Sequence, residues 1–197
     1  MIKAIIFDAD GMVLEQERPS IFLPRDYGIS IENLNSFFHG PFQECLVGKT
    51  DLKEVIYPYL FKWGWSQGLD AFLNLWFTRE VSVNKELVDY INELKSKGIK
   101  CLLATNQEKY RFQYFLDQLD FANIFDKVYA SVNVGHKKTS LEFLSKIFKD
   151  LNNIKKEEIL FWDDRPENVK FAKDFGINAE LFTSVKDFKE KMLQYNP

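Results

Sequence analysis

The chain has 197 residues, of which 46% are hydrophobic and 28% charged, so it is long enough for one globular domain, or for one with a sizeable insertion. Its formal net charge of −3 gives no electrostatic basis for binding nucleic acid. No apolar run approaches the ~20 residues of a membrane span, and the apolar start is too short for a signal peptide. With only Cys45 and Cys101 and no CxxC pair, we expect a reduced, cytoplasmic protein.

The chain begins with a strand of the buried type that ends in two aspartates one residue apart. Residues Ala4 to Phe7 are continuously apolar, as expected of a central parallel strand. Asp8 and Asp10 follow and share a side, because alternate residues of an extended chain point the same way. Gly11 then allows a sharp turn. Two carboxylates held this close repel each other and need a cation or a shared proton.

Between the first strand and about residue 83 the pattern is helical. A loop rich in charge and proline is predicted from residue 15 to 27. A short helix capped by Ser30 follows, then a helical stretch from Thr50 that Pro58 should kink or break, and a helix from Leu69 to Thr78. No strand pattern appears between residues 28 and 80. We therefore expect an all-helical insertion here, in which Trp63, Trp65 and Trp76 are packing residues rather than a substrate platform.

From Val83 onward, predicted strands alternate with helices. The strands cover residues 99–104, 127–131, 159–162 and 178–182, and three of the helices begin after capping residues at Asn84, Ser140 and Ser184. Pro166 stands where a first helical turn tolerates it, and Gly176 ends that helix. This alternation predicts an α/β fold with a parallel sheet and right-handed crossovers.

Polar residues follow four of the predicted strands, whose ends lie on one edge of a parallel sheet. They are Asp8/Asp10, Thr105/Asn106, Lys138 and Asp163/Asp164. Three acidic positions there can hold Mg²⁺, while a lysine and a hydroxyl suit a phosphoryl group. A carboxylate can attack phosphorus, and a second one can protonate the leaving oxygen and then activate water.

These four motifs resemble those of the haloacid dehalogenase (HAD) superfamily, and the resemblance covers nearly the whole chain. They stand here as Asp8-Ala9-Asp10-Gly11, as Leu102-Leu103-Ala104-Thr105 followed by Asn106, as Gly135-His136-Lys137-Lys138-Thr139, and as Asp163-Asp164-Arg165-Pro166-Glu167-Asn168. One Asp-x-Asp is weak evidence, but four motifs in order within strand–helix context are strong evidence.

The resemblance implies a Rossmann-like core of residues 1–14 and 84–197, with a helical cap at residues 15–83 of the subfamily I (C1) type. It implies that Asp8 is the nucleophile and a metal ligand, that Asp10 is the acid/base with its backbone carbonyl on Mg²⁺, and that Asp164 is the third protein ligand. Thr105, Asn106 and Lys138 would form the phosphate cradle, with Thr105 and Lys138 also counted as catalytic, and Asp163 and Asn168 would support the site.

Three positions depart from the family pattern. Met12 stands where Thr or Val is usual, and Arg165 where a small residue is common. Thr139 replaces the usual proline after the motif lysine, so the register could shift from Lys138 to Lys137.

We therefore expect a Mg²⁺-dependent phosphatase that hydrolyses a small phosphorylated metabolite through an aspartyl-phosphate intermediate. A phosphomutase on the same scaffold is the nearest alternative, and a phospho-accepting or partner-binding module without catalysis is another. A dehalogenase is disfavoured because Asp10 is present. We expect neither nucleic acid nor a membrane as a partner, and either a monomer or a homodimer. The substrate depends on cap side chains that no motif describes.

Overall fold

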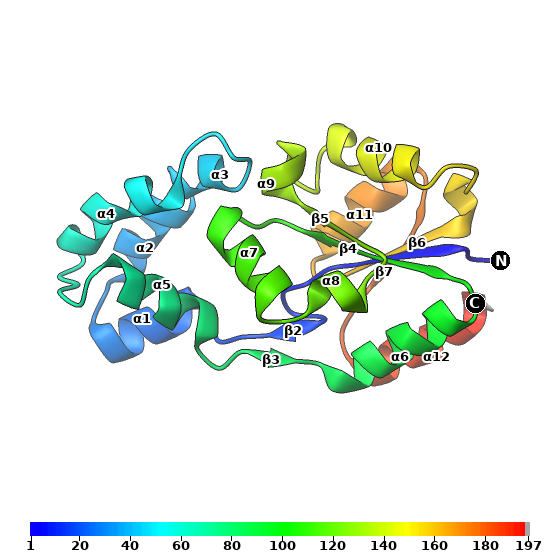
Figure 1. Cartoon of the computed structure of the whole chain (residues 1–197), viewed down its shortest axis with the longest axis horizontal. Helices are drawn as coiled ribbons and strands as arrows, with labels where there is room; N and C mark the ends of the chain where they lie inside the picture. The colour runs from blue at the N-terminus through cyan, green and yellow to red at the C-terminus, as the bar shows by residue number, and fades with distance from the viewer. Residues whose placement is uncertain (196–197) are drawn as a thin grey trace.

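The computed structural model describes residues 1–195 and shows a five-stranded parallel sheet flanked by helices (Figure 1). The strand order is β5-β4-β1-β6-β7. The bounds are β1 Ala4–Phe7, β4 Lys100–Thr105, β5 Lys127–Ala130, β6 Ile159–Asp163 and β7 Asn178–Leu181. The predicted α/β fold with a parallel sheet is confirmed.

Helices cover both faces of this sheet. Their bounds are α6 Lys85–Ser96, α7 Lys109–Asp117, α8 Phe121–Ile124, α9 Ser131–Val134, α10 Leu141–Asp150, α11 Pro166–Phe175 and α12 Val185–Tyr195, with a 3-10 turn at Lys156–Glu158. The side chains of Asn84 and Ser140 accept hydrogen bonds from backbone N–H groups three residues on, as their capping role predicts. Helices α6 and α12 lie on one face, and α10 and α11 on the other (Figure 1).

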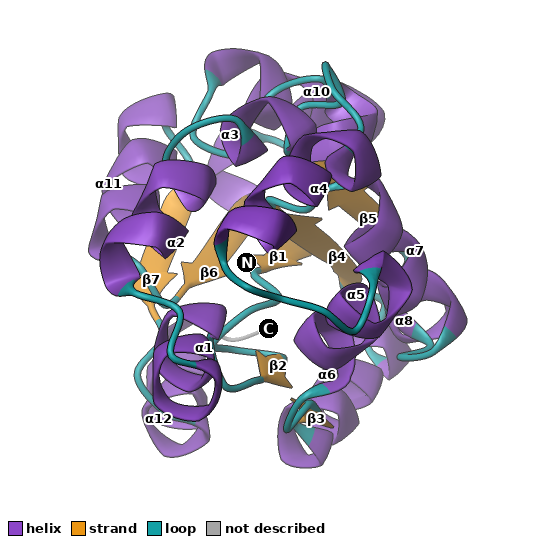
Figure 2. Cartoon of the chain, turned by 90° about the vertical axis from the view of Figure 1, so that its left-hand side faces the viewer, coloured by secondary structure: helices purple, strands orange, loops and turns teal. Residues whose placement is uncertain are grey.

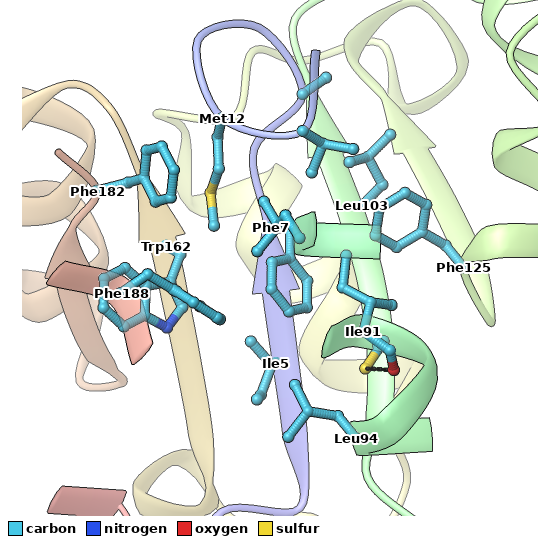
Figure 3. Close-up of a cluster of buried hydrophobic side chains, with 14 of the residues drawn as sticks. Ile5, Phe7, Met12, Ile91, Leu94, Leu103, Phe125, Trp162, Phe182 and Phe188 are labelled. Atoms are coloured by element: carbon cyan, nitrogen blue, oxygen red, sulfur yellow. Dashed lines mark hydrogen bonds between the residues drawn. The ribbon is translucent and has the colours of Figure 1, made fainter. Parts of the chain in front are cut away.

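Alternation along β1 divides the core into two layers. Ile5 and Phe7 pack against α6 and α12, whereas Ala4 and Ile6 face α10 and α11. Figure 3 shows the first layer, in which the rings of Trp162 and Phe188 approach to 4.7 Å between centroids. The side chain of Met12 lies in this layer and is buried, so its departure from the family pattern has a packing role.

A helical layer lies beyond the edge toward which β1 runs (Figures 1 and 2). Two short strands, β2 Leu14–Glu15 and β3 Ser82–Val83, pair antiparallel and connect the α/β part of the chain to this helical layer. Between them lie α1 Pro19–Tyr27, α2 Ile31–Phe38, α3 Phe42–Cys45, α4 Leu52–Lys62 and α5 Leu69–Thr78. These helices enclose a hydrophobic cluster of their own, rich in Phe and Trp. The inserted all-helical unit that was expected is present.

The structure corrects two local predictions in this layer, namely the loop at residues 15–27 and a break at Pro58, which was one of the two alternatives expected there. Residues 15–27 do not form only a loop, because α1 begins at Pro19, where a first turn tolerates proline, and buries Phe22 and Leu23. Helix α4 continues through Pro58 without a break. Pro58 is exposed, and the helix buries Leu52, Ile56 and Leu60 on its other side, so tertiary burial outweighs the local penalty. Among the helices of residues 1–195, none is long and apolar enough to cross a membrane.

Candidate active site

The register of β1 and β6 brings two aspartates together. Phe7 lies beside Trp162, and the backbone N–H of Asp8 donates to the Trp162 carbonyl at 3.0 Å. The next residues, Asp8 and Asp163, are therefore neighbours at the carboxyl edge of the sheet. Their exposed fractions are only 4% and 0%. Two buried carboxylates side by side repel each other, so the fold must supply a cation.

Lys138 supplies that positive charge. Its Nζ lies 2.6 Å from Asp8 Oδ1 and 2.7 Å from Asp163 Oδ2, with 5% of the side chain exposed. Burial lowers the pKa of Lys138, but the two carboxylates outweigh burial and raise it, so the ammonium stays charged. Burial raises the pKa of Asp8 to about 7, an effect that Lys138 opposes and Asp163 reinforces.

Neighbouring groups fix the position of Lys138. Its backbone N–H donates to the side-chain oxygen of Asn106 at 2.8 Å, which joins the loop after β4 to the loop after α9. The side chain of Lys137 donates instead to Gln43 on α3. Of the two lysines left open by the motif register, the structure thus places Lys138 beside Asp8 and directs Lys137 toward the helical layer.

Asp164 completes an acidic cluster. Asp8, Asp163 and Asp164 each offer one oxygen, and these oxygens lie within 4.8 Å of one another. Asp164 Oδ1 is buried and has no hydrogen-bond partner within residues 1–195. Gly11, at φ +82°, permits this approach, since a Cβ there would lie 2.3 Å from Asp164 Oδ2. The unpartnered oxygen and the all-carboxylate donor set fit a hard cation such as Mg²⁺.

The oxygens of Asp163 are already engaged. Oδ1 accepts from the backbone N–H of Arg165 at 2.9 Å and from the Asn168 amide at 2.8 Å, while Oδ2 faces Lys138. Asp163 therefore orients its neighbours, and the oxygens of Asp8 and Asp164 are better placed than those of Asp163 to bind a metal ion.

Asp10 is held by two residues that the sequence analysis did not identify. Arg111 binds both carboxylate oxygens, at 2.6 and 3.0 Å, and the Gln107 amide donates to Oδ2 at 2.5 Å. Burial alone would raise the pKa of Asp10, but Arg111 and Gln107 outweigh it and lower the pKa. Arg111 also donates to Gln16, whose amide donates to the Trp76 carbonyl. Only their position in the sequence could have identified Gln107 and Arg111, because residues 107–111 immediately follow the second motif at the sheet edge.

A cavity of about 830 Å³ lies between the sheet edge and the helical layer. Its lining includes six of the predicted site residues, which are Asp8, Asp10, Thr105, Asn106, Lys138 and Asn168. Thr105 ends β4, is buried, and accepts a 3.2 Å hydrogen bond from Gln107 through its hydroxyl. Helices α2, α3 and α5 line the opposite wall. A phosphoryl group in this cavity would meet an ammonium, a hydroxyl and a carboxylate.

Comparison with known families gives the class of this protein. The sequence model of the family described as "Haloacid dehalogenase-like hydrolase" matches residues 29–181. The chain therefore belongs to the haloacid dehalogenase-like hydrolase family.

Individual relatives differ in how much of the chain they match. A D-ribitol-5-phosphate phosphatase from Bacteroides thetaiotaomicron is 25% identical over 203 residues, which cover 98% of this chain and 97% of that protein. A sesquiterpene phosphatase from Aspergillus oryzae is 30% identical over 91 residues, 46% of each chain. A drimenol cyclase from Aspergillus calidoustus is 33% identical over 98 residues, half of this chain but only 18% of that protein.

Solved structures support the same fold. A predicted HAD-like family hydrolase from Porphyromonas gingivalis has a TM-score of 0.79 at 24% identity, covering 99% of this chain and 98% of that one. A HAD family enzyme from B. thetaiotaomicron, in complex with magnesium and inorganic phosphate, has a TM-score of 0.79 at 19% identity, covering 96% and 98%.

Proposed function

We propose that this hydrolase is a Mg²⁺-dependent phosphatase acting on a small phosphomonoester. The observation that carries the proposal is the buried triad of Asp8, Lys138 and Asp163, of which Asp8 and Lys138 line the cavity. Beside the triad, Asp164 Oδ1 has no hydrogen-bond partner within residues 1–195. The name of the full-length relative, a D-ribitol-5-phosphate phosphatase, gives further support. The likeness to the enzyme with magnesium and inorganic phosphate supports the fold on which this chemistry would take place.

In the proposed first step, Asp8 attacks phosphorus. An Asp8 oxygen forms a bond to phosphorus, the bond from phosphorus to the leaving oxygen breaks, and Asp10 gives a proton to that oxygen. Thr105, Asn106 and Lys138 bind the phosphoryl oxygens, and Lys138 is already charged and positioned for this role. Mg²⁺ bound by Asp8 and Asp164, together with the Asp10 backbone carbonyl, would neutralise charge on the phosphoryl group.

In the second step, Asp10 takes a proton from water, and the water oxygen attacks the aspartyl-phosphate. The phosphorus–Asp8 bond breaks, which releases inorganic phosphate and restores the carboxylate. In the arrangement described above, Arg111 and Gln107 bind both Asp10 oxygens and lower its pKa, which keeps the carboxylate ionised. After these contacts break, Asp10 takes up from water the proton that it donates in the first step. Asp10 must therefore exchange these partners for the substrate during the reaction.

The proposal assigns residues 15–83 to a cap of the C1 type that covers the substrate. The paired strands β2 and β3 lie at the two ends of this segment. The proposal places the hinges of the cap there, near residues 14–17 and 81–84. A small phosphorylated metabolite would enter between this cap and the sheet edge, where the cavity lies.

The test is the release of inorganic phosphate from a panel of phosphate esters, with Mg²⁺ and with a chelator. Lys138→Met should lower activity by about 100-fold or more, because it removes the charge on the phosphoryl group. Lys137→Met is the matched control and should stay within a few-fold of wild type. Circular dichroism establishes that both variants fold. If no ester releases phosphate, the proposal fails, and conversion of a sugar phosphate into its isomer would indicate the phosphomutase instead.

A further inference from the structure

The cavity wall opposite the catalytic residues carries a cluster of apolar side chains. Five of its residues come from α2, the segment around α3, and α5, namely Leu34, Phe38, Phe42, Leu46 and Trp76. The rings of Phe38, Phe42 and Trp76 contact one another, with centroid distances of 5.3 Å for Phe38–Phe42, 5.3 Å for Phe38–Trp76 and 5.5 Å for Phe42–Trp76. We call these five residues the aromatic wall. Trp76, which the sequence analysis assigned to packing alone, packs in the cap cluster and also forms part of this wall.

The polar side chains on the same helices are poorly placed to form hydrogen bonds with a buried substrate. Asn35 and His39 also line the cavity, but they are exposed, so they keep hydrogen bonds to water while the cavity is open. Gln43 is already bonded, since its amide donates to the Phe38 carbonyl and its oxygen accepts from Lys137. The buried part of the helical lining is therefore hydrophobic, and its polar part is exposed or already hydrogen-bonded.

The cavity thus joins a charged floor to an apolar wall. At the floor, Lys138 and Thr105 suit a phosphoryl group, while the rest of the substrate must lie against the helical layer. Hydroxyl groups buried against the aromatic wall would lose their hydrogen bonds to water without gaining others, whereas apolar carbon would gain contacts with the rings. This distribution matches an amphiphilic molecule with one charged end.

We infer that the alcohol released by this enzyme is predominantly apolar, an aryl or alkyl alcohol rather than a polyol. The inference rests on the proposed phosphatase function and narrows its substrate class. It also separates this chain from its 25% identical relative, which is named for the phosphate of a polyol.

The experiment compares kcat/KM for benzyl phosphate and for glycerol 3-phosphate. Both esters release a primary alcohol, so the difference chiefly reports how the rest of the molecule is bound. The wild-type protein should favour benzyl phosphate by about 10-fold or more, the range expected for apolar discrimination in a hydrophobic pocket. Phe38→Asn should reduce this ratio by about 10-fold, and Phe38→Leu, which keeps the apolar surface, should largely retain it.

Phe61→Asn is the matched control. Phe61 lies on α4, does not line the cavity and is 87% exposed, so this substitution should change neither kcat/KM value. A wild-type preference for glycerol 3-phosphate, or an unchanged ratio in folded Phe38→Asn protein, would overturn the inference and leave the phosphatase intact. If the protein hydrolyses neither of these esters, and none in the wider panel, both the proposed function and the inference are overturned.

Discussion

The two walls of the cavity bury opposite kinds of side chain. At the sheet edge, Asp8, Asp163 and Lys138 are buried and paired with one another. Across the cavity, the helices α1–α5 contribute none of the buried polar or charged residues found within residues 1–195. Buried charges are tolerated only in fixed geometry with every partner in place, whereas apolar surfaces tolerate changes of shape. Under the proposed function, this difference assigns reaction chemistry to the sheet edge and substrate selection to the helices.

Few polar contacts join the two walls. The Tyr110 hydroxyl donates to Asp51, which caps α4, and Arg111 donates to Gln16. The Lys137–Gln43 hydrogen bond is a third such contact, and the ion pairs Lys109–Asp51 at 3.7 Å and Arg18–Asp164 at 3.5 Å are two more. These contacts lie at the surface or are partly buried, so they can break at low cost in free energy. Hinge motion at residues 14–17 and 81–84 stays a prediction, and the small number of contacts is compatible with it.

The largest expected effect concerns the nucleophile. Asp8→Asn should lower phosphate release by about 1,000-fold or more, because an amide does not attack phosphorus. The fold should survive, since the change removes one of two neighbouring negative charges and Lys138 keeps Asp163 as a partner. Phosphate release and thermal melting measure the two effects. Asp89→Asn, at an exposed position on α6, is the control, and normal turnover by folded Asp8→Asn protein would refute the assignment.

Metal removal should have the next largest effect. A chelator should abolish activity and Mg²⁺ should restore it, while Ca²⁺ should substitute poorly because of its looser coordination. Asp164→Asn should weaken Mg²⁺ binding by about 10-fold or more, as measured by calorimetry without substrate. Full activity in chelator, or unchanged Mg²⁺ affinity in the variant, would show that the acidic cluster has another purpose.

Sequence reasoning predicted the sheet edge better than the helices, for a physical reason. Motifs such as Asp8-Ala9-Asp10-Gly11 lie at strand ends, and topology alone brings such ends together. By contrast, α1 contains Pro24 and forms because Phe22 and Leu23 are buried by residues distant in sequence. Arg111 was missed for a similar reason. Its contact with Asp10 spans 101 positions in the chain and leaves no local pattern.

A substitution in the helical layer that lowers stability but leaves phosphate release intact would sharpen the comparison between the two walls. Phe37 is fully buried in the helical layer, and its ring contacts those of Phe38, Phe42, Tyr59 and Trp63 at 5.1 to 5.6 Å between centroids. Phe37→Ala should reduce the free energy of unfolding by about 3–5 kcal/mol. Protein that remains folded at low temperature should still release phosphate from a small generic ester. Urea denaturation measures the loss, and a change below about 1 kcal/mol would mean that this ring is not part of a close-packed core.

The smallest expected effect concerns an ion cluster remote from the cavity. Asp150 ends α10, where the helix dipole disfavours a negative charge, and it accepts hydrogen bonds from Lys127, Lys146 and Tyr129 at 2.7, 2.8 and 3.0 Å. Lys127 and then Lys146 lower the pKa of Asp150 below its ordinary value. A lowered pKa in the folded state means that the carboxylate stabilises the protein above the unfolded-state pKa, and that this contribution is lost as pH falls through the folded-state pKa.

Asp150→Asn should therefore reduce the free energy of unfolding by about 1 kcal/mol at pH 7, a value kept small because these lysines are half exposed. The difference between variant and wild type should persist down to about pH 4 and shrink as the pH falls further, since protonation then removes the same charge from the wild-type protein. Denaturation series at pH 7, 5 and 3 measure it. Phosphate release should not change, because Asp150 does not line the cavity. A pH-independent difference would mean that the side chain acts through packing, and a loss of activity would show that charges outside the sheet edge also support the reaction.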